Sequence, residues 1–204
     1  MRYVLGILCL LLGQEALAGR SCNQPSDFGR CWWKQGWAVT VYSGPLTSQT
    51  SSKIIRDPDF SKSGIIAFAV SKELRHFLEN RLGFELESQA VQHFGKQRHF
   101  EINPIVLIAR WSAFPWNRSL PTTLAIGDGV SIATTKPKHE VERRGKHDSA
   151  RTLNYVMAEA TFAHPCYPQW ALVARYHHRS GMFGVFHGVH DASTAFAAGL
   201  KYWF

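Results

Sequence analysis

A histidine and a serine, His178 and Ser180, stand two residues apart near the end of a long alternating segment of the chain. Side chains alternate across a β-strand, so both point to one face, with Cβ atoms about 6.5–7 Å apart. A histidine ring can bridge that gap to a hydroxyl group. The pair has the residue types of a general base and a nucleophile, and attack on an ester carbonyl is the chemistry it supports.

The face that carries this pair is otherwise apolar, whereas the opposite face ends in Arg175, His177 and Arg179. A soluble sheet buries its apolar face in a protein core. A membrane barrel instead turns that face to lipid and keeps charges in its lumen. On the second interpretation, His178 and Ser180 lie at a lipid boundary, where attack on a lipid ester needs a base beside a hydroxyl group.

The first 18 residues have the pattern of a cleaved secretory signal peptide. Arg2 precedes the apolar run 3–13, and a small-x-small cleavage site follows at 16–18. The apolar run is too short to span a bilayer as a helix. We therefore divide the chain into a signal peptide (1–18), an N-terminal segment (19–36) and a barrel (37–204).

After residue 36 the chain shows eight alternating segments of the length that a tilted barrel strand needs. They predict an all-β fold, an eight-stranded antiparallel up-and-down transmembrane β-barrel. Pro45 and Pro104 are expected at strand ends or bulges. Residues 73–83 have helical composition, which predicts a short helix or a long turn. The predicted strands are 37–48, 63–72, 84–95, 100–114, 122–134, 151–164, 169–183 and 193–204.

The last segment carries the strongest membrane signal. Its alternate residues are mostly apolar and end in an aromatic ring, at Phe196, Ala198, Leu200, Tyr202 and Phe204. A terminal Phe in this pattern is typical of outer-membrane barrels. An even strand count places both termini in the periplasm, so the links after the first, third, fifth and seventh strands face outside. We therefore expect a monomer in the outer membrane of a Gram-negative bacterium, after signal-peptide cleavage.

An acid that orients the histidine is harder to identify. Asp191 is the only acid between Ser180 and the C-terminus, and it is the candidate third member; a solvated loop acid is the alternative. Thr194 has the parity of the outward face but cannot act as a carboxylate. Glu159 has the opposite parity to its apolar neighbours, so it is expected in the lumen.

A basic link between the fifth and sixth strands suits an anionic partner. The chain has a formal net charge of +8, which favours phosphates or lipid head groups. Facing outside, this link would meet the phosphates of lipopolysaccharide, although a plain solvated loop is an equal alternative. Nucleic acid is not expected, because the chain carries an export signal and no nucleic-acid-binding motif. The candidate phosphate contacts are Lys136, Lys138, Arg143 and Arg144.

The charges predicted to point inward need partners. Arg175, His177, Arg179 and Lys201 are expected to join acids in a structural network that fills the lumen, so no channel is expected. Asp128 has the parity of lipid-facing residues. Because a carboxylate without a partner does not belong there, a bulge at a neighbouring glycine is expected to turn it away.

Three cysteines remain after signal cleavage, at Cys22, Cys31 and Cys166. In an oxidising compartment Cys22 and Cys31 could close a small loop; the alternative is three free thiols. The 10 histidines are scattered without metal-ligand spacing, so we expect no metal and no cofactor.

Several stretches of the chain together resemble the lipid A deacylase-like, or acyloxyacyl-hydrolase-like, outer-membrane barrels. They cover most of the mature chain and are most specific in its last two strands. The resemblance implies an eight-stranded barrel that removes the ester-linked 3-hydroxyacyl chain of lipid A, with His178 as base and Ser180 as nucleophile. The stretches are Phe114–Asn117, Gly127–Ser131, Leu153–Tyr155, His177–Gly181 and Gly199–Phe204.

Two positions depart from that family. Its characterised members carry an Asn directly after the Ser, where this chain has Gly181, and a Glu near the start of the last strand, where this chain has Thr194. Those residues serve the oxyanion and the base. Three hypotheses follow: a serine esterase acting on lipid A, with Asp191 and the Gly181 backbone N–H as substitutes; a non-catalytic barrel that binds lipopolysaccharide or supports the envelope; and a soluble barrel with a ligand inside.

Overall fold

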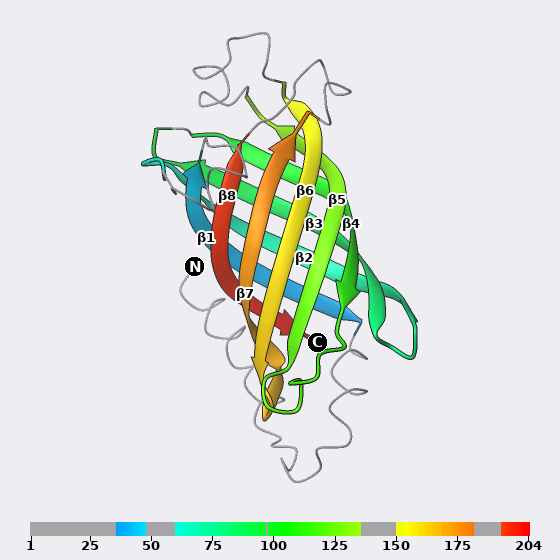
Figure 1. The fold of residues 1–204 in the computed structure, drawn as a ribbon. Helices are drawn as coiled ribbons and strands as arrows, with labels where there is room; N and C mark the ends of the chain where they lie inside the picture. The colour runs from blue at the N-terminus through cyan, green and yellow to red at the C-terminus, as the bar shows by residue number, and fades with distance from the viewer. Residues whose placement is uncertain (1–35, 48–59, 97, 136–149, 182–192) are drawn as a thin grey trace, which may run out of the picture.

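The chain forms a closed barrel of eight antiparallel strands in the computed structural model, which describes residues 36–47, 60–96, 98–135, 150–181 and 193–204. Each strand pairs with the next, and β1 pairs with β8 to close the barrel (Figure 1). This confirms the predicted barrel. The strands are β1 (Trp37–Thr47), β2 (Gly64–Phe77), β3 (Leu82–Phe94), β4 (Phe100–Trp111), β5 (Thr122–Ala133), β6 (Thr152–His164), β7 (Tyr167–Ser180) and β8 (Thr194–Trp203).

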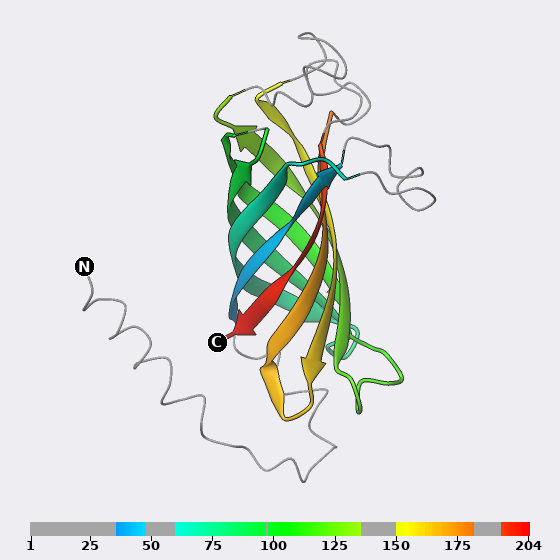
Figure 2. The ribbon, with the colours of Figure 1, turned by 90° about the vertical axis from the view of Figure 1, so that its left-hand side faces the viewer.

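The two ends of the barrel are distinct. At the terminus end the backbones of Trp37 and Phe204 exchange hydrogen bonds of 3.3 and 2.9 Å, which join the first strand to the last residue. At the opposite end, which we call the link end, β1, β3, β5 and β7 finish (Figure 2). His178 and Ser180 close β7, so they lie near the link end.

The barrel is apolar outside and polar inside, the reverse of a soluble protein. Alternation along each strand produces this arrangement: in β3, Phe84 is exposed while the neighbouring Glu85 and Glu87 are buried. Contact with lipid, and not with water, explains so much exposed apolar surface. Strand residues with exposed apolar side chains include Val41, Ile66, Phe68, Ile102, Leu107, Leu124, Ile126, Ile132, Leu172 and Leu200.

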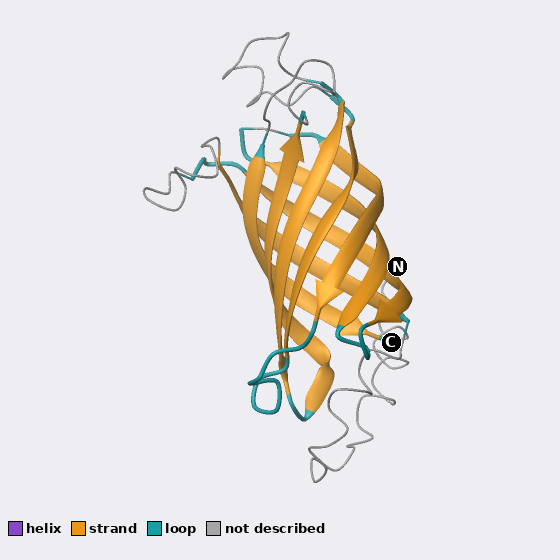
Figure 3. Ribbon diagram, turned by 45° about the vertical axis from the view of Figure 1, so that its right-hand side comes forward, coloured by secondary structure: helices purple, strands orange, loops and turns teal. Residues whose placement is uncertain are grey.

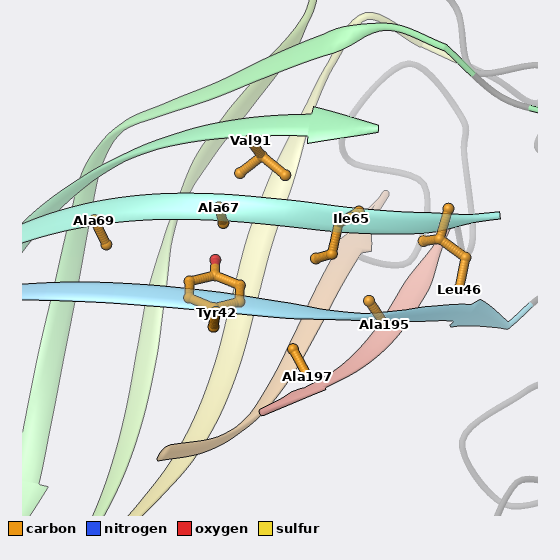
Figure 4. Packing of buried hydrophobic residues seen from close by; sticks show 8 residues of the cluster. All are labelled: Tyr42, Leu46, Ile65, Ala67, Ala69, Val91, Ala195 and Ala197. Atoms are coloured by element: carbon orange, nitrogen blue, oxygen red, sulfur yellow. The ribbon is translucent and has the colours of Figure 1, made fainter. Parts of the chain in front are cut away.

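A buried apolar cluster fills part of the interior between β1, β2, β3 and β8 (Figure 4). Its largest member is Tyr42, and four of the others are alanines, which leave room for the tyrosine ring. The hydroxyl group of Tyr42 donates to Gln89 Oε1 at 2.8 Å, which connects this cluster to the polar interior. A soluble barrel with a ligand inside does not fit such a filled lumen. The cluster consists of Tyr42, Leu46, Ile65, Ala67, Ala69, Val91, Ala195 and Ala197.

Residues 73–83 differ from the prediction. They form neither a helix nor a long turn: β2 continues to Phe77, a tight turn follows, and β3 begins at Leu82 (Figure 3). Leu78, Glu79 and Asn80 have φ values of 52°, 56° and 67°, so three successive left-handed residues reverse the chain. Pairing between β2 and β3 therefore determines the structure of this segment, although its composition favours a helix. None of the described residues belongs to a helix that is long and apolar enough to cross a membrane.

Both prolines lie where a strand tolerates them. Pro45 pairs with Gly64 at the beginning of β2, near the end of β1. Pro104 lies in a bulge, because the register of β4 against β5 shifts between Ile102 and Val106. The strands approach closely beside this bulge: a Cβ atom on Gly129 would lie 2.2 Å from the carbonyl oxygen of Ile105.

Candidate active site on the outer face

The predicted base and nucleophile lie on the outer face of β7. His178 and Ser180 are half-buried, and they continue the outward alternation of Leu172 and Ala174, which are exposed. Arg175 and Arg179 point the other way and are fully enclosed. The alternation therefore brings the histidine and serine to the same side of the barrel wall, at the edge of its apolar surface.

A threonine on the neighbouring strand holds the His178 ring. Register places His178 directly opposite Thr194 on β8, and Nδ1 of His178 lies 2.8 Å from Oγ1 of Thr194. If the ring donates through Nδ1–H to this hydroxyl group, Nε2 becomes the basic nitrogen. Thr194 thus occupies the position of an orienting residue, although it is not a carboxylate.

Aromatic rings border the base on the apolar side. The ring of Tyr176 stacks at 5.6 Å from that of His178, and Phe196 meets Tyr176 edge-on at 5.4 Å. These contacts restrict the motion of the imidazole. They also place it against an apolar surface that an acyl chain could cover.

An amide group lies opposite the serine. Asn154 on β6 pairs in register with Ser180, which brings the Cβ atoms of outward-facing partners to about 4.5–5.5 Å. Asn154 donates through Nδ2 to Oδ1 of Asp128 at 2.8 Å. A primary amide has two N–H groups, and this bond uses one of them.

The placement of Asp128 corrects the prediction that a bulge turns it away from the lipid side. The side chain is exposed, and the pairing of β5 with β6 runs without a shift through this position. Its bond to Asn154 supplies the partner that an outward carboxylate needs. Sequence reasoning missed this pair, because the two residues are 26 positions apart and meet only through strand register.

Together these side chains form a polar row across four neighbouring strands, and we call it the outer polar row. It runs from β5 to β8 at the link end of a mostly apolar exterior. It holds a histidine in contact with a threonine, a serine, and an amide that donates to a carboxylate. Its members are Asp128, Asn154, Ser180, His178 and Thr194.

The acid predicted beside the base lies outside the described residues, as do the basic residues predicted to contact phosphate. These are Asp191, Lys136, Lys138, Arg143 and Arg144. The predicted Cys22–Cys31 pairing also lies outside them. Cys166, in the turn between β6 and β7, is disulfide-bonded, which corrects the alternative of three free thiols.

The lumen holds a dense charge network, as predicted. Glu159 accepts hydrogen bonds from Arg110 at 2.8 Å and from Arg175 at 2.8 Å, and it lies 3.4 Å from Nζ of Lys201. Glu85 and Glu87 complete the acids: Glu85 binds Arg110 at 2.5 Å, and Glu87 binds Arg175 at 2.7 Å. Three carboxylates thus meet three cations, all of them buried. This network is structural and lies on the other side of the wall from His178 and Ser180.

Comparison with known proteins gives the fold. No family model and no curated protein matches the chain. Among solved structures, the outer membrane enzyme PagL is similar over 82% of this chain and 99% of its own, with a TM-score of 0.55 and 11% identity. Neisserial surface protein A is similar over 83% and 97%, with a TM-score of 0.47 and 13% identity. OprG from Pseudomonas aeruginosa covers 83% and 96%, with a TM-score of 0.39 and 11% identity.

Proposed function

We propose that the chain is an outer-membrane serine esterase that removes an ester-linked 3-hydroxyacyl chain from lipid A. The observation that carries the proposal is the outer polar row. A histidine whose Nδ1 contacts Thr194 and a serine two residues further on lie half-buried on the outer face, with the buried amide of Asn154 opposite the serine.

The apolar exterior supports a place in the membrane. Burying this surface in lipid is favourable by about 25 cal/mol per Å² of apolar area, whereas leaving it in water forfeits that term. The signal peptide predicted at residues 1–18 supports export from the cytoplasm. A disulfide at Cys166 fits an oxidising compartment.

The proposed reaction assigns a role to each member of the row. Nε2 of His178 takes the proton of the Ser180 hydroxyl group as its oxygen attacks the ester carbonyl. Thr194 keeps the ring oriented through Nδ1. The second N–H of Asn154, fixed by Asp128, and the backbone N–H of Gly181 donate to the oxyanion. The acyl group then passes from Ser180 to water, while lipid A leaves with its free hydroxyl group.

Substrate contact is assigned to the link end. The predicted basic residues at 136–144 would meet lipid A phosphates there, next to the row. Asp191 remains a candidate for a second orienting group. The proposed attack by Ser180 requires neither the basic residues at 136–144 nor Asp191.

A second candidate is a non-catalytic barrel that binds lipopolysaccharide. It is favoured by one observation: the base is oriented by a neutral hydroxyl group, that of Thr194, and not by a carboxylate. This weakens stabilisation of the imidazolium that forms during attack. The two candidates differ in whether any bond is cleaved.

Mass spectrometry of lipid A from cells that produce the chain separates them. We expect the loss of one 3-hydroxyacyl mass with the native chain and not with Ser180→Ala. Ser88→Ala is the matched control, because Ser88 is also an exposed outward serine but donates to the Pro104 carbonyl at 2.6 Å. An unchanged spectrum with the folded barrel in the outer membrane would contradict the esterase and leave the binding role.

A further inference from the structure

Two histidines and a glutamate gather inside the barrel at the link end. His93 is the second-last residue of β3, His99 lies in the link that follows, and Glu101 is the second residue of β4. All three side chains are buried, and one potential ligand atom from each lies within 4.8 Å of the others. This cluster is separated from the outer polar row by the barrel wall, so it needs its own explanation.

His99 is the unusual member. It is 6% exposed, yet neither of its ring nitrogens has a hydrogen-bond partner among the described residues. Buried polar groups are nearly always bonded, because losing water without replacement is costly. A neutral imidazole with an available lone pair is the form that binds a metal ion.

The other two members of the cluster contact each other. Nε2 of His93 lies 2.8 Å from Oε2 of Glu101, and the His93 and His99 rings stack at 3.9 Å. Ligand atoms around a tetrahedral zinc ion lie about 3.3 Å apart, given bonds of about 2.0–2.1 Å. Because the stacked rings direct their lone pairs along nearly parallel planes, at least one imidazole must rotate out of the stack for all three groups to reach one ion.

A second layer of residues holds the glutamate in place. His177 lies 3.2 Å from Oε1 of Glu101 through its Nε2, and its Nδ1 is 3.0 Å from the Tyr42 hydroxyl group. Support of this kind fixes a carboxylate so that its other oxygen can bind a metal. Oε2 is the oxygen that faces His93.

One nearby charge opposes a cation. Nε of Arg179 lies 3.9 Å from Oε2 of Glu101. Arg179 has other partners, since it donates to Ser131 Oγ at 2.9 Å and to the carbonyl oxygens of Ala150 and Arg151 at 3.3 and 3.1 Å. A metal ion would thus replace a long ion pair without leaving the guanidinium unbonded, at some cost in affinity.

We propose that His93, His99 and Glu101 bind a divalent transition-metal ion of the zinc type, with water completing its coordination. Two imidazoles and a carboxylate suit zinc better than calcium or magnesium, which prefer oxygen ligands. The ion would clamp the link between β3 and β4 to the lumen. The spacing of the histidines along the chain gives no sign of this site, because the link and the strand alternation bring them together. The proposal is independent of ester hydrolysis.

The test uses the full-length folded barrel in detergent, stripped with a chelator, desalted and then titrated with Zn²⁺ alone. Retained zinc is measured by elemental mass spectrometry, with cobalt absorption as a second readout of nitrogen and oxygen ligands. His99→Phe keeps the ring stack without a ligand atom, and His99→Gln is a second variant in case the first folds poorly. His164→Phe is the control, since His164 is an exposed histidine at the end of β6, on the terminus side of the barrel and away from the cluster.

We expect about one zinc ion per barrel with the native chain and with His164→Phe. We expect at least a tenfold loss of affinity with both His99 variants. Absence of zinc from the native barrel would overturn the proposal, as would retention of zinc by the folded His99 variants. Loss that is equal in His164→Phe would also overturn it, because it would indicate unspecific binding by exposed histidines.

Discussion

The polar side chains inside the barrel and those on its outer face differ in how they are balanced. Inside, Glu85, Glu87 and Glu159 meet three buried cations, and each charge has partners at bonding distance. Outside, Asn154 donates to Asp128 at one end of the row, and His178 contacts Thr194 at the other. The charges of the interior network neutralise one another, whereas the outer row lies on the side of the wall that faces the lipid.

This difference separates polar side chains that stabilise the barrel from those proposed to act on substrate. Arg175 and His178 are three residues apart on β7, yet opposite parity gives one to the network and the other to the row. Breaking the network should therefore reduce stability and leave the chemistry intact. Breaking the row should do the reverse, and the following predictions test that contrast.

The largest effect is expected from removing the base. His178→Gln should lower the rate of lipid A deacylation by about 10³-fold or more, because the serine loses its proton acceptor. The barrel should fold normally, since the ring lies on the outer face. Rates measured with purified barrel and lipid A in mixed micelles check this. A variant with near-native activity would remove His178 from the mechanism.

The largest structural effect is expected inside. Glu159→Gln leaves Arg110, Arg175 and Lys201 with less negative charge and should destabilise the barrel by about 3–5 kcal/mol. Unfolding by urea in lipid vesicles measures this. Glu79→Gln is the control: Glu79 faces Arg81 at 3.4 Å in an exposed pair, so its loss should cost under about 1 kcal/mol. Equal effects of both variants would contradict the structural role of the network.

The oxyanion role of Asn154 predicts an intermediate effect. Asn154→Leu should lower the maximal rate by about 10²-fold and change the Michaelis constant little, because an oxyanion donor acts in the transition state. Asp128→Asn is the companion variant and should have a smaller effect, since an amide can still accept a bond from Asn154. A change confined to the Michaelis constant would indicate that Asn154 binds substrate instead.

The smallest effect is expected at the orienting hydroxyl group. Thr194→Val keeps the shape of the side chain but removes the 2.8 Å contact with His178. We expect about a tenfold lower rate, and a Thr194→Ser variant that keeps most of the activity, as measured by the same assay. If valine and serine behave alike, the hydroxyl group does not orient the base.

The strands and the faces of their residues followed from sequence, because lipid outside and charge inside impose a period of two. The eight predicted strands match those observed, with β2 extended most at its end. The outward positions of His178 and Ser180 and the inward position of Glu159 came from the same parity. The turn at 78–81 could not be predicted in this way. Its residues favour a helix by composition, and nothing in their types indicates three successive left-handed conformations.

Contacts between strands were beyond sequence reasoning. The bond from Asn154 to Asp128 depends on the register of β5 against β6, because a slip of one residue would leave the two side chains on opposite sides of the wall. The approach of His93, His99 and Glu101 depends on a link as well as on two strands. Parity fixes which side of the wall a residue occupies, but register fixes its neighbours.

The most direct test of the central claim asks whether Ser180 is nucleophilic. The folded native barrel would be treated with an acyl-chain phosphonate that reacts with activated serines, and the site of labelling mapped by peptide mass spectrometry. We predict one adduct, on Ser180, that disappears with His178→Gln while labelling of Ser88 stays absent in both. Labelling that is absent from Ser180, or unaffected by loss of His178, would contradict an activated serine on the outer face.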